Sequence, residues 1–193
     1  VELGKMLYFD PRLSSTGTVS CFSCHNVMEA GEDDRAVSVG VDGKKGNRSA
    51  PTVWNAAFLN VQFWDGRAAT LEDQAKGPMV NPVEMGMADH GLVVTRIAGI
   101  PGYVDAFRGA FPGQKDPITI DNIAKAIACF ERTLVTPNSA YDRYLKGETS
   151  AMDSQQKRGM KLAQDIGCTT CHNGPVFAGP LNPGQGFYMK FPM

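Results

Sequence analysis

Apolar residues recur at helical spacing in several short stretches of the chain. Ile123, Ile127 and Leu134 fall on one face, which predicts a core helix over residues 121–135. Further helices are expected at 2–9, 103–110 and 154–165, and two more begin after the capping residues Thr70 and Asp89. Patterns typical of strands are nearly absent. The sequence therefore predicts an all-α protein.

Long polar stretches separate these helices and suggest how the chain is divided. Residues 14–51 are rich in Gly, Ser, Asp and Asn, and irregular segments of this length are usually functional. The sequence TPNS at 136–139 interrupts the core helix. We therefore expect two domains, residues 1–140 and 141–193. Each contains a helix, a Cys-x-x-Cys-His motif and a loop rich in Gly and Pro, which indicates a degenerate internal duplication.

The motif occurs as CFSCH at residues 21–25 and as CTTCH at residues 168–172. Cys-x-x-Cys-His is the attachment pattern of c-type haem, in which both thiols form thioethers and the imidazole coordinates iron. One helical turn separates the two cysteines, so both thiols can reach the same haem. The predicted haem-attaching residues are Cys21 and Cys24 with the iron ligand His25, and Cys168 and Cys171 with the iron ligand His172.

Two other interpretations of the motif are weaker. A zinc site needs four ligands, and outside the motifs the chain has only His90 and Cys129 to offer. A redox dithiol is not usually followed by histidine. The odd number of cysteines, five, also argues against a framework made only of disulfides. We interpret Cys129 as a buried structural thiol and His90 as a surface or capping residue.

Composition excludes some classes of function. The net charge of −1, without a Lys/Arg cluster, argues against a nucleic-acid-binding protein. No apolar run approaches the length of a membrane span. The chain opens mid-pattern at VELGKMLYFD, which we interpret as a mature or trimmed start. Because c-type haem is attached outside the cytoplasm, we expect a periplasmic or cell-surface bacterial protein.

The sixth ligand of each iron decides what the haem can do. Met opposite His is typical of electron transfer, whereas an open position can bind and activate a small oxidant. The chain has three histidines, and two of them are already assigned as proximal ligands. At most one haem can therefore have two histidine ligands, through His90. At least one iron is expected to be Met-ligated or open.

Several long stretches together resemble the bacterial dihaem cytochrome c peroxidases. They are LGKMLYFDPRLSSTGTVSCFSCHNV, GNRSAPTVWNAAF, QFWDGRAATLEDQAKGPMVNPVEMG and IAKAIACFERTLVTPNSAYDRYLKG before CTTCHNGP. The resemblance covers essentially the whole chain and extends to the dihaem oxidase that matures methylamine dehydrogenase. It implies two c-type-cytochrome-like domains with long irregular loops and one covalent haem each. The N-terminal haem would be peroxidatic, and the C-terminal haem would accept electrons.

The resemblance also implies roles for three residues outside the motifs. Trp64 would be an electron bridge between the haems, and Gln74 and Glu84 would be catalytic residues over the peroxidatic haem. Peroxide cleavage needs a base that moves a proton from one oxygen to the other, which suits Glu84. Gln74 would hold the peroxide by hydrogen bonds without adding charge. Without the resemblance, Trp64 would be interpreted as core and Glu84 as a solvated turn residue.

The sequence departs from the family pattern after the first motif. Many members carry a histidine in that loop, and it caps the peroxidatic iron until the other haem is reduced. Here the aligned position is Val41, and residues 26–89 contain no histidine. We therefore expect an N-terminal haem that is five-coordinate or water-bound and needs no reductive activation.

A second departure is length, because the family's second domain continues well past this end. We expect the second domain to be incomplete and its methionine ligand to lie beyond Met193, with Met189 as the remaining candidate. The resemblance further implies a calcium ion near Asn47 and Ser49, and a homodimer.

The function expected from these features is reduction of hydrogen peroxide to water, with electrons from a small cytochrome c or copper protein. Two alternatives stay open. One is a dihaem electron-transfer cytochrome with no turnover of its own, which the shortage of histidines disfavours. The other is a dihaem oxidase that acts on a partner protein, which would share nearly every residue discussed.

Overall fold

A computed structural model describes residues 1–174 and 176–178, which divide into two compact units. Unit 1 comprises Val1–Ala57 and Val61–Leu134, and unit 2 comprises Phe58–Asn60 and the chain from Val135 onward. Within the described residues, β-pairing is limited to three isolated bridges, so the predicted all-α class is confirmed. None of the described helices combines the length and the apolar character needed to cross a membrane. The division at residues 140 and 141 into two haem domains stays a prediction.

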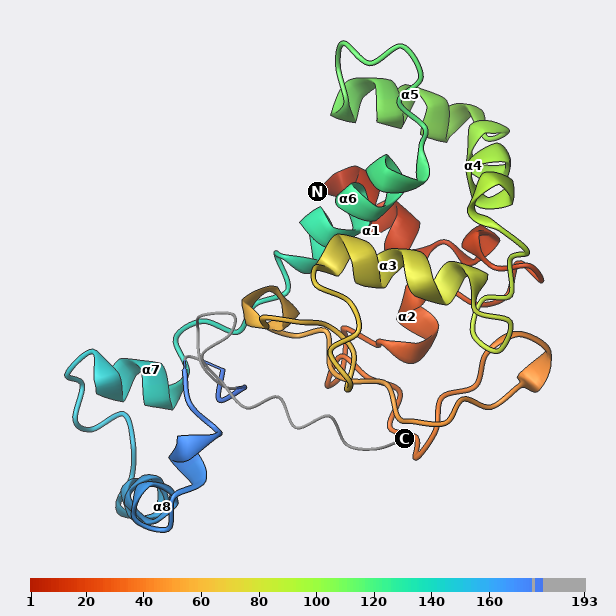
Figure 1. Ribbon diagram of the computed structural model, residues 1–193. Helices are drawn as coiled ribbons and strands as arrows, with labels where there is room; N and C mark the ends of the chain where they lie inside the picture. The colour runs from red at the N-terminus through yellow and green to blue at the C-terminus, as the bar shows by residue number, and fades with distance from the viewer. Residues whose placement is uncertain (175, 179–193) are drawn as a thin grey trace. The chain divides into compact units, whose positions relative to one another are not determined.

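Figure 1 shows the helices of both units. Those of unit 1 are α1 (Glu2–Phe9), α2 (Cys21–Cys24), α3 (Leu71–Val80), α4 (His90–Ala98), α5 (Pro101–Ala110) and α6 (Ile120–Glu131). Unit 2 contains α7 (Ala140–Leu145) and α8 (Ser154–Asp165). Short 3₁₀ turns occur at η1 (Pro11–Leu13), η2 (Val41–Gly43), η3 (Ala56–Phe58) and η4 (Cys168–Thr170). The segment between α2 and α3 contains no longer helix than these turns, as its composition predicts.

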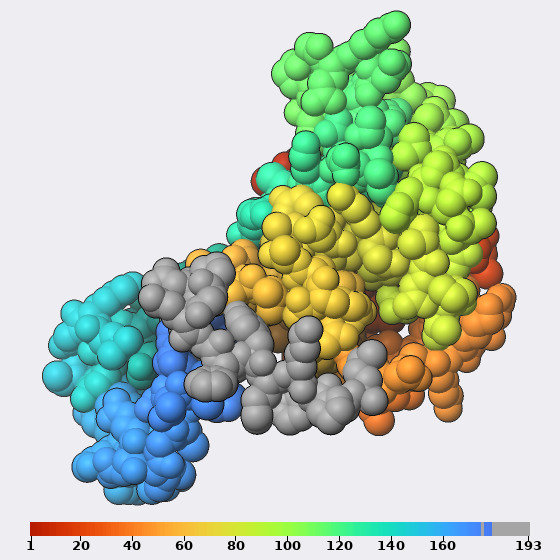
Figure 2. All heavy atoms as spheres, viewed as in Figure 1, coloured from red at the N-terminus to blue at the C-terminus, as the bar shows by residue number. Residues whose placement is uncertain are grey.

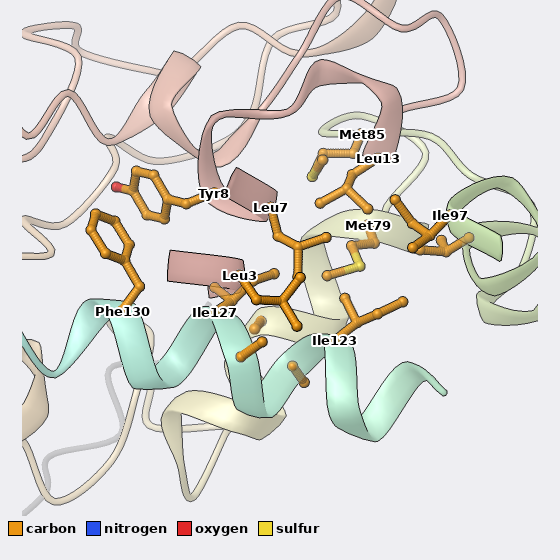
Figure 3. Packing of buried hydrophobic residues seen from close by; sticks show 14 of the residues in the cluster. Leu3, Leu7, Tyr8, Leu13, Met79, Met85, Ile97, Ile123, Ile127 and Phe130 are labelled. Carbon is orange, nitrogen blue, oxygen red and sulfur yellow. The ribbon is translucent and has the colours of Figure 1, made fainter. Parts of the chain in front are cut away.

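The core of unit 1 is built around α6, which packs against α1 and α3. Leu3 and Leu7 of α1 point toward the apolar face of α6 (Figure 3). Ile123 and Ile127 on that face are almost completely buried, and the predicted core helix is confirmed. Burial of the apolar surface between α1, α3 and α6 is the main stabilising contribution to the unit. The outer side of α3 is open to solvent on the face of unit 1 shown in Figure 2.

A glycine allows α1 to approach α6 closely. A Cβ atom at Gly4 would lie 1.8 Å from the carbonyl oxygen of Ala126 and 3.0 Å from the Cβ atom of Phe130. Any larger residue would push the two helices apart. One turn further along α1, Tyr8 contacts Phe130 edge to face, with 5.1 Å between ring centroids.

Both capping residues expected from the sequence are confirmed. The side chain of Thr70 accepts a hydrogen bond from the Asp73 amide at the start of α3. The side chain of Asp89 accepts one from the Leu92 amide at the start of α4. Each bond satisfies a backbone donor that the first turn of a helix leaves unpaired.

Two expectations about α6 are wrong. The helix ends at Glu131 rather than at residue 135, because the chain turns there and the Leu134 carbonyl accepts a hydrogen bond from the Asn55 amide. Cys129 is exposed rather than buried. Lys125 and Cys129 are four residues apart and lie on the one stripe of α6 that faces solvent, whereas most other positions around the helix are buried.

In unit 2, both helices begin with a reciprocal capping box. Ser139 and Asp142 form the box of α7, which the sequence patterns did not predict. Asp153 and Gln156 form the box of α8. No residue of α8 is buried among the described residues.

We predict that Gly4→Ala destabilises unit 1 by about 2–3 kcal/mol, because the added methyl group overlaps a backbone oxygen of α6. Urea unfolding of the haem-loaded protein would report the change as a lower midpoint. Gly109→Ala in α5 is the matched control, since a Cβ atom there meets nothing within 4 Å. Alanine favours the helix by up to ~1 kcal/mol over glycine, so this control is expected to be neutral or stabilising. Equal midpoints for both variants would contradict the close approach.

Candidate haem-binding site

The first Cys-x-x-Cys-His motif is folded as a single helical turn. The backbone amide of His25 donates to the Cys21 carbonyl over 2.9 Å, which closes α2. The Ser20 amide donates to the Ser23 hydroxyl over 2.9 Å at the start of the turn. Residues three apart on a helical turn lie on one side of it, so Cys21 and Cys24 face the same direction.

The imidazole of His25 is oriented by a backbone carbonyl. Its Nδ1 lies 3.0 Å from the Pro51 oxygen, which can only accept, so Nδ1 carries the proton. Nε2 is left with its lone pair available to a metal ion. Metal-binding histidines commonly show this second hydrogen bond, which sets both tautomer and ring orientation. Burial lowers the pKa of His25 and favours the neutral form that a metal requires.

The position of His25 also depends on α1. The hydroxyl of Tyr8 donates to the His25 carbonyl oxygen over 2.7 Å. Tyr8 is fully buried, and burial raises the pKa of its hydroxyl. The motif is therefore attached to the α1–α6 core by a hydrogen bond from a group that stays protonated.

The residues around the motif fit a covalently attached haem. Cys21 and Cys24 are both free thiols, and burial raises the pKa of Cys21 to about 12 and that of Cys24 above its usual range. Both carboxylate oxygens of Asp33 are buried without a hydrogen-bond partner among the described residues. The charge of Asp33 raises the pKa of Cys24 and that of His25. Within residues 1–174 and 176–178, no group of three or more His, Cys, Asp or Glu side chains is arranged to hold a metal ion.

The second motif repeats this arrangement in unit 2. The His172 amide donates to the Cys168 carbonyl over 2.8 Å, and Nδ1 of His172 lies 3.2 Å from the Phe177 carbonyl oxygen. Gly167, with φ of +86°, makes the turn from α8 into the motif. Unlike their counterparts in unit 1, Cys168, Cys171 and His172 are exposed within the described residues. Both motifs thus form the same kind of turn, and they differ in how far their side chains are exposed.

Glu84 lies in a tightly held turn after α3. Its Oε1 accepts a hydrogen bond of 2.7 Å from the amide nitrogen of the Asn81 side chain. Burial raises the pKa of Glu84, and the nearby Arg67 partly opposes the shift. The charge of Glu84 in turn raises the pKa of the Cys24 thiol, so the carboxylate lies within electrostatic reach of the first motif. The interpretation of Glu84 as a solvated turn residue is therefore wrong, because the side chain is partly buried and oriented.

Asn81 is a site residue that the sequence reasoning missed. Besides orienting Glu84, its Oδ1 accepts from the Val83 amide over 2.9 Å, and its carbonyl accepts from the Gly86 amide over 2.8 Å. Gly86 has φ of +70°, a conformation that favours glycine. The signal was present in the sequence, because Asn followed by Pro is typical of a turn in which the Asn side chain bonds to the backbone.

Val41 packs directly behind this turn. Its side chain is 1% exposed, and its amide donates to the Glu84 carbonyl over 2.9 Å. A Cβ atom at Gly40 would lie 2.0 Å from the Val83 carbonyl oxygen, so the two loops are in van der Waals contact. An aliphatic side chain with no ligating atom therefore occupies position 41, where the family resemblance led us to look for a histidine.

The other residues singled out from the sequence are described one by one. Trp64 is 63% exposed, and its Nε1 donates to the Ser49 carbonyl over 3.0 Å, so its interpretation as core is wrong. Gln74 is half-buried on α3, and no hydrogen bond joins it to Glu84 among the described residues. His90 begins α4, and its Nε2 lies 3.0 Å from the Lys76 carbonyl oxygen, as suits a structural residue. Met189 and Met193 lie outside the described residues.

Comparison with known proteins places these features in a family. The model of the family described as di-haem cytochrome c peroxidase matches residues 1–150. The cytochrome c551 peroxidase of Pseudomonas aeruginosa is 54% identical over 98% of this chain and 53% of its own length. The chain belongs to the di-haem cytochrome c peroxidase family. The resemblance inferred from the sequence is thereby confirmed.

Two further relatives show the breadth of the family. The methylamine utilization protein MauG of Methylorubrum extorquens is 42% identical over 90% of this chain and 49% of its own. The crystal structure of a MauG-like protein associated with microbial copper homeostasis has a TM-score of 0.80 and 35% identity, over 89% of this chain and 51% of that one. The chain thus spans about half the length of these di-haem relatives. Membership in the family implies two haems, in agreement with the two motifs.

We predict that replacing Cys21 and Cys24 together by Ala removes one of the two covalent haems, because no thioether can then form at the first motif. Mass spectrometry of the denatured protein, produced in a host that attaches c-type haem, would show the loss of one haem mass. Cys129→Ala is the control, because this exposed thiol lies outside both motifs. Loss of haem in the control, or two haems in the double variant, would contradict the assignment.

Proposed function

We propose that this chain carries the peroxide-reducing site of a dihaem peroxidase, which reduces hydrogen peroxide to water. A small cytochrome c or copper protein would supply the electrons. The observation that carries this proposal is the Glu84 carboxylate, which Asn81 holds near the first haem-attachment motif. The names of the relatives support the same reaction. When bound, the haem iron would supply the chemistry that binds and reduces a small oxidant.

Glu84 is suited to move the proton in this reaction. Cleavage of the O–O bond requires a base that takes a proton from one peroxide oxygen and returns it to the other as water leaves. Burial raises the pKa of Glu84 toward the operating pH, which makes both transfers feasible for the same group. The hydrogen bond from Asn81 to Oε1 restrains the carboxylate and leaves Oε2 for the substrate. Gln74 would add a neutral hydrogen-bonding group.

Electrons would enter at the haem held by His172 and reach the haem held by His25 by way of Trp64. Cys168 and Cys171 of the second motif are exposed within the part of unit 2 that the structure describes, which would suit approach by a donor protein. The hydrogen bond to Ser49 restrains the Trp64 indole while most of its surface stays exposed. On this route, the haem held by His25 would react with the oxidant, and the haem held by His172 would react with the electron donor.

We further propose that the first haem is open without reductive activation. Val41 cannot ligate iron, and residues 26–89 supply no histidine. The loop that contains Val41 contacts the Glu84 turn, and this contact restrains the loop. A periplasmic location, a calcium ion near Asn47 and Ser49, and a homodimer complete the proposal. The location is supported by the two c-type haem motifs, and the calcium ion and the homodimer are supported by the resemblance alone.

A second candidate function is oxidation of residues in a partner protein. It is favoured by the 42% identity to a methylamine utilization protein over 90% of the chain. Glu84, Trp64 and both haem motifs would serve either reaction. A turnover assay with a reduced cytochrome c as electron donor would support the peroxidase, whereas peroxide-dependent modification of a partner protein without donor turnover would support the oxidase.

We predict that Glu84→Gln lowers kcat/KM for hydrogen peroxide by about a hundredfold or more, because the glutamine amide cannot accept the proton. In the wild type the rate is expected to fall as pH decreases through the pKa of Glu84, since only the carboxylate acts as a base. Burial raises this pKa above the ordinary value of 4.5, so the acidic limb lies at higher pH than for a solvated Glu. Stopped-flow rates against pH should show this limb in the wild type and not in the variant.

Glu29→Gln is the matched control for this experiment, because Glu29 is exposed and outside the site. It should retain both the rate and the acidic limb. Wild-type rates in Glu84→Gln would show that another group moves the proton.

We predict that the diferric protein shows a high-spin signal in electron paramagnetic resonance, and that hydrogen peroxide consumes this signal. Val41→His is expected to replace it by a low-spin signal and to suppress the peroxide reaction until the protein is reduced. Val41→Leu keeps an aliphatic side chain and should behave like the wild type. Two low-spin signals in the wild type would contradict an open site.

A further inference from the structure

Glu131, the last residue of α6, is a buried carboxyl group that the proposed reaction does not use. The residue is 5% exposed, and its Oε2 is buried without a hydrogen-bond partner among the described residues. Ionised carboxylates without partners are costly to bury, so such groups usually bind a proton. This burial is unusual in a helix whose other charged residues, Asp121 and Lys125, are exposed.

The charges near Glu131 do not form an ion pair with it. Arg132, the next residue, makes two hydrogen bonds with Glu72 of α3, of 2.7 and 3.0 Å, and is therefore already paired. Burial is the main reason that the pKa of Glu131 rises to about 8, with Arg132 lowering it and Glu72 raising it further. Among the described residues, α4, which also packs on α6, adds no charge that acts on this carboxyl.

The groups on the other side of Glu131 belong to the first haem motif and its support. Its charge raises the pKa of the Cys21 thiol of α2, so the carboxyl lies within electrostatic reach of a haem-attaching sulfur. It also raises the pKa of Tyr8 of α1, whose hydroxyl donates to the His25 carbonyl. Glu131 therefore lies in a poorly solvated region within electrostatic reach of the first motif, and it directly follows Phe130, whose ring contacts Tyr8.

We propose that Glu131 binds the proton that accompanies one-electron reduction of the N-terminal haem site. The electron comes from the reduced donor protein or from a chemical reductant such as ascorbate or dithionite. The proton comes from solvent and adds to the Glu131 carboxylate, and no other bond forms or breaks. Reoxidation reverses both transfers. The proposal requires haem at Cys21, Cys24 and His25, but it does not depend on peroxide being the oxidant.

The coupling follows from electrostatics in a region of low polarity. The iron site carries one more positive charge before reduction than after it, and this extra charge favours the carboxylate form of Glu131. Reduction removes that charge and raises the affinity of the carboxylate for a proton. The midpoint potential of this haem therefore falls as pH rises between the pKa values of Glu131 in the oxidised and reduced protein. A proton taken up in this way is stored close to the site where peroxide reduction consumes protons.

The test is a spectroelectrochemical titration of the haem-loaded protein between pH 6 and pH 9. The transition of the N-terminal haem is identified by its absence from the Cys21→Ala, Cys24→Ala double variant. In the wild type its midpoint should fall by up to about 59 mV per pH unit over part of this range, the value for a tenfold change in a one-electron equilibrium. Glu131→Gln resembles the protonated form, so its midpoint should stay near the wild-type value at low pH and should not change across that range.

Glu29→Gln, the same substitution at an exposed position, should retain the wild-type slope. An unchanged slope in Glu131→Gln would overturn the proposal and assign the proton to another group, such as a haem propionate. If Glu131→Gln does not fold, the redox-difference infrared spectrum of the wild type provides the test. A protonated carboxyl band that appears on reduction, and that shifts when the glutamates of the protein but not the haem are isotopically labelled, supports the proposal. No such band on reduction overturns it. Because peroxide turnover is not measured here, these outcomes are independent of the role of Glu84.

Discussion

The close contact between α1 and α6 is the constraint on which the rest of unit 1 depends. It is possible only because Gly4 lets the helix backbone approach Ala126. One turn further, the contact places Tyr8 against Phe130 and directs its hydroxyl to the His25 carbonyl. Glu131, the last residue of α6, is also buried, and its charge reaches the first haem motif. A packing contact between two short helices thus sets the position of an iron ligand.

The second level of organisation is contact between loops rather than helices. Val41 donates to the Glu84 carbonyl, and Gly40 leaves room for the backbone of the Glu84 turn. Asn81 satisfies the amides of that turn and orients its carboxylate. The irregular part of the chain is therefore ordered by specific hydrogen bonds, which hold the Glu84 carboxylate in a defined position.

Much of this organisation could be predicted from the sequence, because its causes are local. The caps Thr70 and Asp89, the core positions of α6 and the two haem motifs depend on spacing and residue type alone. The exposure of Cys129 could not be predicted in this way, since it depends on which stripe of a nearly buried helix remains open. The role of Asn81 was signalled by the following proline, but its bond to Glu84 depends on the folded turn. The carbonyl that orients His25 comes from Pro51, and its contact with the ring depends on how the intervening loop folds.

The two imidazoles differ in how their orientation is established. The carbonyl that holds Nδ1 of His172 comes from Phe177, five residues further along the chain, so a short segment can orient this ring by itself. The carbonyl that holds Nδ1 of His25 comes from Pro51, 26 residues away, and is in place only after the intervening loop has closed. Cofactor attachment therefore places different demands on the folding chain at the two motifs. The second imidazole is oriented as soon as its own turn forms, whereas the first is oriented only in a folded domain.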